Sequence, residues 1–171
     1  MQFNEKTIEE IRKDLHRHID NICDGILAEL NGAQYAGDGL EGIRLLNNAG
    51  RFKGTKAKAV LFPDGRRISV RKWKEVVATL LADCITDQNR LNYLLEIRGR
   101  VFGKQRLILA DSPSGMAQPM QICDQLWMET KYDTETLLRV LMFRIFDVVG
   151  YDYGGVRIML REDGVRHVVS E

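Results

Sequence analysis

The chain has 171 residues, of which 44% are hydrophobic and 29% are charged, and its formal net charge is +1. This composition is that of a folded globular domain and excludes a disordered chain. No stretch approaches the roughly 18 to 20 consecutive apolar residues of a membrane helix, and the charged stretch "MQFNEKTIEEIRKDL" lacks the apolar centre of a secretory signal, so we expect a cytoplasmic protein that does not contact a membrane.

A long amphipathic helix is predicted over residues 7–30, within a segment that we assign to residues 1–31. Thr7 and Glu10 fit a capping box at its start. Its apolar positions repeat at steps of three and four residues, which makes a narrow stripe that needs a partner. We predict a homodimer through residues 7–30; the alternative is that the helix packs on its own chain. The stripe consists of Ile8, Ile11, Leu15, Ile19, Ile22, Ile26 and Leu30.

Residues 32–50 are predicted to be a glycine-rich linker followed by a short helix over "GLEGIRLLNNAG". The string "GDGLEG" has the spacing of a dinucleotide-binding loop, but such a loop follows a strand, and here a helix precedes it. Asp38 and Glu41 would also repel phosphate. We therefore interpret this string as linker.

An α+β domain is predicted over residues 51–171. The segments "KAVLF" and "RRISV" flank "PDG", which indicates a hairpin, and alternation would place Lys58 and Val60 on one face of it. The next segment, "VRKWKEVVATLLADCI", has the periodicity of a helix with Trp73 in the core, and "NRLNYLLEI" predicts a second, short helix that Asn89 could cap. The expected buried face of the first helix consists of Trp73, Val76, Val77, Leu80, Leu81 and Cys84.

The rest of the domain is expected to hold short strands and one buried helix. "RLILA" and "QLWMET" read as strands, and "DSPSGMAQP" reads as the loop between them. Asp133 is expected to cap "TETLLRVLMFRIFDVVG", which is apolar nearly all round and so predicts a central helix. "VRIMLRE" and "VRHVV" would form a closing hairpin. The whole predicts a small, mostly antiparallel sheet with helices packed on one face.

Catalytic, metal and cofactor sites are not indicated by the sequence. His16 and His18 are two positions apart and point in different directions on a helix. Ser112 and Ser114 lie in a predicted loop, and only His167 lies outside the first helix to serve as a base. Three widely spaced cysteines predict reduced thiols. We therefore expect a protein without catalytic residues, bound metal or cofactor.

The charge along the chain is uneven, and residues 51–74 are strongly basic. This segment carries nine basic residues and one acid, a net of +8, whereas residues 1–50 have five basic and nine acidic residues, a net of −4. A polyanion responds to such local charge within about 8–10 Å. The candidate phosphate contacts here are Arg51, Lys53, Lys56, Lys58, Arg66, Arg67, Arg71, Lys72 and Lys74.

Two features favour binding over a merely solvated edge strand, which lysine also protects from pairing. Arg71, Lys72 and Lys74 are expected in the first turn of a helix, where positive charge costs some tenths of a kcal/mol each. A second basic loop, "IRGRVFGKQR", adds further cations. The candidate contacts in that loop are Arg98, Arg100 and Lys104, with Arg106 beside them.

The run "KGTKAKAVLFPDGRRISVRKWKEVVATLLADC" resembles a small module of bacterial restriction-linked and mobile-element proteins. The shared pattern is a basic lead-in, a short hairpin, and Val-x-x-Trp opening a helix, here Val70 to Trp73. The stretch from Leu107 to Asp152 is similar to the second half of that module, so the resemblance covers about residues 53–152. The usual Lys-Pro is Lys56-Ala57 here. The resemblance implies a non-catalytic accessory or nucleic-acid-associated domain.

Two functions follow most directly from these observations, and a third, a hydrolase, would need a pocket that holds an acid or base of shifted pKa. The first is an accessory protein that binds DNA or RNA through its phosphates. The second is a protein-binding regulator, such as an inhibitor of a defence nuclease encoded by a phage or mobile element. Its near-neutral net charge argues against a simple DNA mimic, which would be strongly acidic.

Overall fold

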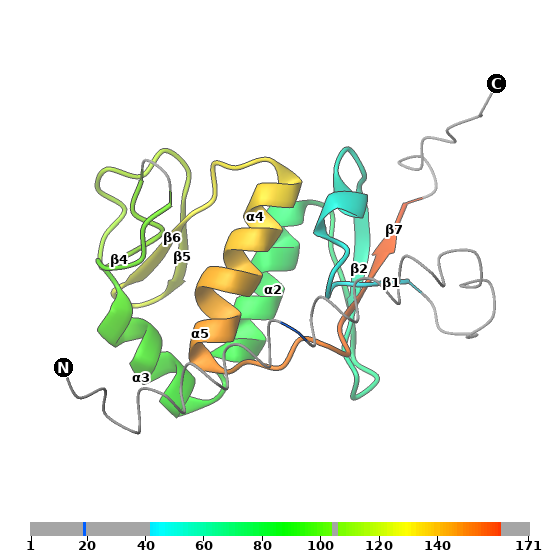
Figure 1. The fold of residues 1–171 in the computed structure, drawn as a ribbon, viewed down its shortest axis with the longest axis horizontal. Coiled ribbons are helices and arrows are strands. Elements are labelled where there is room, and N and C mark those ends of the chain that lie inside the picture. The colour runs from blue at the N-terminus through cyan, green and yellow to red at the C-terminus, as the bar shows by residue number, and fades with distance from the viewer. Residues whose placement is uncertain (1–18, 20–41, 104–105, 162–171) are drawn as a thin grey trace. The chain divides into compact units, whose positions relative to one another are not determined.

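The computed structural model describes residues 19, 42–103 and 106–161 of the chain (Figure 1). The chain divides into two units, residues 1–40 and 41–171, and all the elements below belong to the second. The predicted helix over 7–30, apart from residue 19, most of the linker and the last strand of the closing hairpin lie outside the described residues. Within the described part, no helix has the length and apolarity needed to cross a membrane.

A four-stranded antiparallel sheet contains the predicted hairpin. β2 (Ala57–Leu61) pairs with β3 (Arg67–Ser69), as "KAVLF-PDG-RRISV" predicts. β7 (Arg157–Leu160) inserts between β2 and the two-residue β1 (Ile43–Arg44), which gives the order β1-β7-β2-β3. The alternation predicted in β2 is interrupted by a bulge between Ala57 and Ala59; Lys58 is exposed, whereas both Ala59 and Val60 are buried.

A second, three-stranded antiparallel sheet has the order β4-β6-β5, so the expectation of a single sheet is wrong. β4 (Leu109–Ala110) and β6 (Leu126–Glu129) fall within the predicted strands. β5 (Pro119–Cys123) was missed; it begins at a residue that the sequence indicated as loop. Proline is tolerated there because the first residue of a strand can do without an amide hydrogen.

Helices α2 (Trp73–Cys84) and α3 (Gln88–Ile97) follow the hairpin, as predicted. The apolar face of α2 is buried from Val76 to Cys84. The cap of α3 is one correction. Asp87, not Asn89, accepts the amide hydrogens of Asn89 and Arg90 at 2.9 and 3.0 Å, because the helix begins two residues earlier than expected.

Asp133 caps the central helix, as predicted, by accepting the Thr136 amide at 3.1 Å. The helix runs through α4 (Thr134–Val140), a π-helical segment (Leu141–Phe146) and α5 (Asp147–Val149). It ends where Gly150 takes a left-handed conformation with φ of +65°, which glycine adopts without strain. Its buried side chains include Leu138, Leu141, Ile145 and Phe146.

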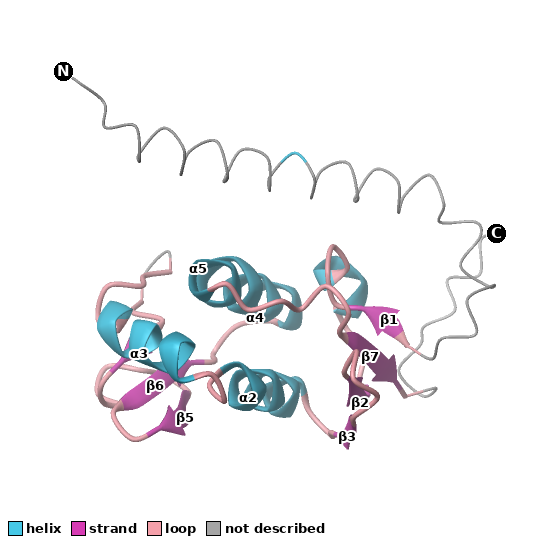
Figure 2. Ribbon diagram, turned by 90° about the horizontal axis from the view of Figure 1, so that it is seen from below, coloured by secondary structure: helices cyan, strands magenta, loops and turns pink. Residues whose placement is uncertain are grey.

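Helices α2 and α4, but not α3, lie between the two sheets rather than on one face of a single sheet (Figure 1). α2 contacts β2 on one side and β5 on the other. Figures 1 and 2 show α2 and α4 as the middle layer of this unit, with the four-stranded sheet on one side and the three-stranded sheet on the other. The α+β class is confirmed, but each sheet is smaller than predicted because the strands are divided between two.

The short helix predicted over "GLEGIRLLNNAG" is replaced by β1 and a 3-10 helix, η1 (Ala49–Phe52). Gly42 has a φ of +90°, and a Cβ there would lie 3.1 Å from the carbonyl oxygen of Ile158. This close approach lets Ile43 pair with Ile158. Residues 42–50 therefore belong to the folded unit, which begins before position 51.

Candidate nucleic-acid interface

The basic segment 51–74 spans η1, the β2–β3 hairpin and the start of α2, so its cations are divided between two places. α2 has 12 residues and is therefore about 18 Å long. One group of cations lies at the start of this helix. The other, Arg66 and Arg67, lies at the hairpin turn, near the end of the helix.

Three contacts bring residues 51–58 beside residues 70–74. The indole Nε1 of Trp73 donates a hydrogen bond to the carbonyl oxygen of Thr55 at 2.9 Å. The Trp73 ring packs on Phe52 with centroids 5.1 Å apart, and the Val70 amide donates to the Lys58 carbonyl at 2.9 Å. Trp73 is thus half-buried against Phe52, which agrees with its predicted place in the core.

Most cations at the start of α2 are exposed, and among the described residues no side-chain partner is found for them. We call this group the basic surface. Lys74, which we include, reaches across to the Pro119 carbonyl with its Nζ at 3.4 Å. Lys56 and Arg67 are also exposed, but each already has an interaction of its own. The basic surface consists of Arg51, Lys53, Lys58, Arg71, Lys72 and Lys74.

Fewer cations lie in the first turn of α2 than the sequence predicted. Arg71 precedes the helix, Lys72 is its N-cap without a side-chain capping bond, and only Lys74 lies in the first turn. Glu75 is the acid nearest to them in sequence, and it accepts the Arg71 amide at 2.7 Å. Glu135, which lies close to Gly50, forms an ion pair with Arg139 at 3.0 Å. Neither carboxylate neutralises the basic surface through a side-chain ion pair.

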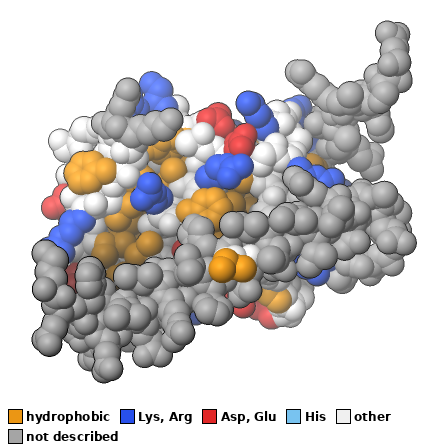
Figure 3. Space-filling view, viewed as in Figure 1, with side chains coloured by type: hydrophobic (Ala, Val, Ile, Leu, Met, Phe, Trp, Pro, Cys, Tyr) orange, Lys and Arg blue, Asp and Glu red, His pale blue; other side chains and the backbone are white. Residues whose placement is uncertain are grey.

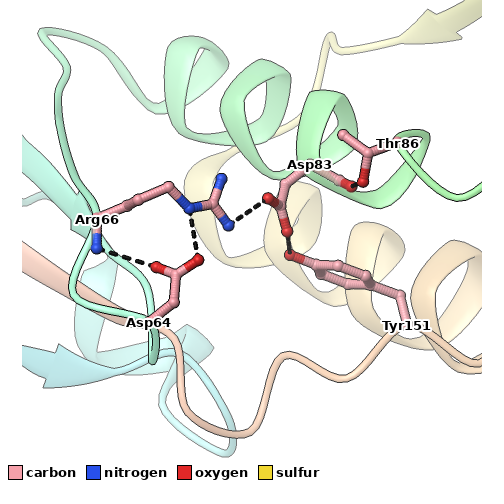
Figure 4. Close-up of polar contacts among 5 residues, drawn as sticks. All are labelled: Asp64, Arg66, Asp83, Thr86 and Tyr151. Carbon is pink, nitrogen blue, oxygen red and sulfur yellow. Dashed lines mark hydrogen bonds and ion pairs between the residues drawn. The ribbon is translucent and has the colours of Figure 1, made fainter.

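Arg66, a predicted phosphate contact, is already bound within the protein (Figure 4). Its Nε lies 2.6 Å from Asp64 Oδ2, its Nη2 lies 2.6 Å from Asp83 Oδ1, and its guanidinium lies over the Phe62 ring. The Arg66 amide and side chain lower the pKa of Asp64. Because both carboxylates take up the guanidinium, we remove Arg66 from the candidate contacts.

The other carboxylate oxygen of Asp83 holds Tyr151, whose hydroxyl donates to Asp83 Oδ2 at 2.6 Å (Figure 4). Burial and this hydrogen bond raise the pKa of Tyr151 above its usual value. The Arg90 guanidinium lies 5.3 Å from the centroid of the Tyr151 ring. These contacts link the hairpin turn, the end of α2 and the segment after α5, and they indicate a structural role.

The second predicted basic loop is also divided. Arg98 donates to the Gln125 carbonyl at 3.1 Å, so it holds the turn between β5 and β6. Arg100 is exposed and has no partner among the described residues, and Lys104 lies outside them. Arg106 Nη1 lies 3.8 Å from Glu129 Oε2 while its side chain stays partly exposed.

Glu129 is fully buried and connects this loop to the basic surface. Its carboxylate accepts the amides of Ala117 at 2.6 Å, Gln118 at 3.0 Å and Lys131 at 2.8 Å. Burial alone would raise the pKa of Glu129, but these amides and Arg106 lower it below its usual value. The segment that Glu129 fixes, residues 117–119, is the one that Lys74 reaches.

Sequence reasoning missed Lys131, which is exposed and lies two residues after the strand that ends at Glu129. No sequence signal connected it with Lys74, because their segments are brought together by the pairing of Pro119 with Glu129, which neighbours in the sequence do not indicate. Within the described ranges, no group of three or more His, Cys, Asp or Glu side chains is placed to hold a metal. The chemistry that this arrangement offers is the binding of anions.

On the face shown in Figure 3, lysine and arginine side chains are spaced apart, with hydrophobic, uncharged and some acidic side chains between them. Comparisons with protein-family models, curated proteins and solved structures found no match.

Proposed function

We propose that this protein binds nucleic acid by its phosphate backbone, through the basic surface. One observation carries the proposal: five exposed cations without a partner among the described residues come from two chain segments that lie side by side at the start of α2. They are Arg51, Lys53, Lys58, Arg71 and Lys72.

Unpaired cations that lie together raise the local positive potential, and a polyanion gains by releasing the counterions that these groups would otherwise hold. The first amides of α2 add a positive partial charge in the same place. Contacts of this kind position a backbone but do not read sequence. We therefore expect binding with little sequence preference and a strong dependence on salt.

The contacts from the sequence are revised in two ways. Arg66 and Arg98 are excluded because their guanidinium groups hold the hairpin turn and the β5–β6 turn. Lys74 is retained at the edge of the basic surface. The resemblance to restriction-linked modules and the homodimer through residues 7–30 remain predictions that agree with an accessory role.

The test is fluorescence anisotropy with short DNA and RNA oligonucleotides at about 50 and 200 mM salt, a range over which several phosphate contacts change affinity by orders of magnitude. The variant is a triple charge reversal, Lys53→Glu, Arg71→Glu and Lys72→Glu. The matched control reverses Arg44 and Arg144, which are exposed on β1 and on the π-helical segment. Arg144 lies ten residues beyond Thr134, about 15 Å along the helix from its start.

We expect the triple variant to lose binding and to flatten the salt dependence, and the control to bind as the wild type does. Absence of binding by the wild-type protein at low salt would overturn the proposal. A partner that the wild type retains after nuclease treatment, and the triple variant does not, would then assign the basic surface to an acidic protein, which is the regulator alternative.

A further inference from the structure

The basic surface continues across one end of the three-stranded sheet. Pro119 pairs with Glu129, the Glu129 amide donates to Ile108 at 2.9 Å, and the Ile108 amide donates to Val101 at 2.7 Å. These residues form a row across four neighbouring segments, and three strand spacings make it about 14 Å wide. Lys74 lies at the Pro119 end, and Phe102 follows Val101 at the other.

Phe102 is 59% exposed, more than any other large hydrophobic side chain that the structure describes. Successive side chains of an extended segment point to opposite faces. Val101 packs against the hydrophobic core, so Phe102 points away from it. An aromatic ring this exposed forgoes the free energy that its burial would provide.

The backbone around Phe102 is held in place. Phe102 forms a bridge with Leu107, and the Gly103 amide donates to the Arg106 carbonyl at 2.8 Å. The Tyr132 hydroxyl lies so near Gly103 that a Cβ there would be 3.0 Å from it. The ring is therefore presented on an ordered backbone, which lowers the entropy cost of using it in binding.

Cations lie beside this aromatic ring in the chain and across the sheet. Arg100 is exposed two residues before Phe102, and Lys131 is exposed two residues after the end of β6. Arg106 is not included, because its guanidinium lies 3.8 Å from the buried Glu129 carboxylate. Proteins that bind single-stranded nucleic acid combine cations that contact the phosphate backbone with an aromatic ring, on which any unpaired base can stack. In a duplex the base faces are already stacked on each other.

We infer that the nucleic acid is single-stranded and that one base stacks on Phe102 while the phosphates follow the row toward Lys74 and the basic surface. The inference rests on the proposed function and adds the strandedness of the ligand and the group that contacts a base. The bound nucleic acid would then cross the end of the three-stranded sheet, from Phe102 to the start of α2.

The test compares Phe102→Ala and Phe102→Trp in the full chain, by anisotropy with a labelled oligothymidine and with a duplex of the same length. Phe143→Ala is the matched control, because Phe143 is also an exposed phenylalanine, at 43%, and lies on the π-helical segment. Thermal unfolding of each variant shows that it is folded.

We expect Phe102→Ala to weaken single-strand binding roughly tenfold, the loss typical of one stacked base, with duplex binding unchanged. Phe102→Trp should retain affinity, and its added fluorescence should be quenched by the oligonucleotide. Unchanged single-strand binding by Phe102→Ala, or an equal loss for duplex, would overturn the inference. If the inference about Phe102 failed but the triple charge reversal still abolished binding, the proposed function would stand. If the wild-type protein bound neither the oligothymidine nor the duplex, both the proposed function and this inference would be overturned.

Discussion

Arg66 of the hairpin turn forms an ion pair with Asp83 of α2, with Nη2 and Oδ1 2.6 Å apart. The two residues belong to different layers, so the pair fixes the four-stranded sheet to the helices. Arg66 is thus a cation that stabilises the fold, in contrast to the cations of the basic surface, which are available to a ligand.

Replacement of this pair should therefore reduce stability and leave binding intact. Asp83→Ala leaves the Tyr151 hydroxyl without its acceptor, and we expect a loss of about 1–3 kcal/mol in the free energy of unfolding, the usual cost of an unsatisfied buried polar group. Arg66→Ala should also lower the melting temperature. Denaturant unfolding and anisotropy measure the two effects; a large loss of nucleic-acid affinity in Arg66→Ala would return this residue to the interface.

Tyr151 should resist ionisation at alkaline pH, because burial and Asp83 raise its pKa. A pKa that is raised on folding contributes stability below the unfolded value of about 10, and this stability is lost as the pH rises above that value. Tyr151→Phe should cost about 1 kcal/mol at neutral pH and should remove part of the alkaline destabilisation. Unfolding at neutral and alkaline pH, with tyrosine absorbance, tests this; equal alkaline slopes in both proteins would contradict it.

Glu129 should contribute to acid sensitivity, because its pKa is lower than the usual 4.5. A pKa that is lowered on folding gives stability above the unfolded value, and this stability is lost as the pH falls through the folded value. Glu129→Gln places a donor against backbone amides and should cost about 1–3 kcal/mol at neutral pH. Its unfolding free energy should then fall less steeply below pH 4.5 than that of the wild type. Asp111→Asn, an exposed carboxyl in the preceding loop, is the control and should change neither quantity.

Cys84 should react slowly with thiol reagents, because burial raises its pKa to about 11 and only the thiolate is nucleophilic. Cys123 is half-buried, so of the two cysteines that the structure describes it should be modified before Cys84. Mass spectrometry of peptides after timed alkylation distinguishes the two sites. Equal rates of labelling at Cys84 and Cys123 without denaturant would contradict this prediction and would show that α2 opens readily.

Sequence patterns predicted the helices and the hairpin that short-range interactions determine. "PDG" located the hairpin, the periodicity from Val76 to Cys84 located the buried face of α2, and Asp133 located the start of α4. The two-residue β1 could not be found in this way, since it is a strand only because β7 lies beside it. The start of β5 was missed for a related reason: Pro119 is typical of a loop, and its pairing with β6 is a long-range contact that the neighbouring residues do not indicate.

The candidate site was predicted as a run of charge but not as a surface. The sequence grouped Arg66 with Lys72 because they are close in the chain, whereas the structure places them toward opposite ends of α2. It could not show that Asp83 binds Arg66, since no spacing rule joins a turn residue to a carboxylate on the last turn of the following helix. Lys131 was missed because its neighbours in space come from other strands.

The order of strands in the four-stranded sheet has a consequence for how the chain folds. β7 lies between β1 and β2, yet it is made after every other described element, and Arg157 donates to the carbonyl of Gly42, 115 positions earlier. Contacts of such long sequence separation slow folding. During synthesis the β2–β3 hairpin and α2 can form on the ribosome, but β1 and β2 remain open edges until β7 emerges. A nascent chain that stalls before residue 157 would therefore expose two unpaired strands and would be prone to aggregation.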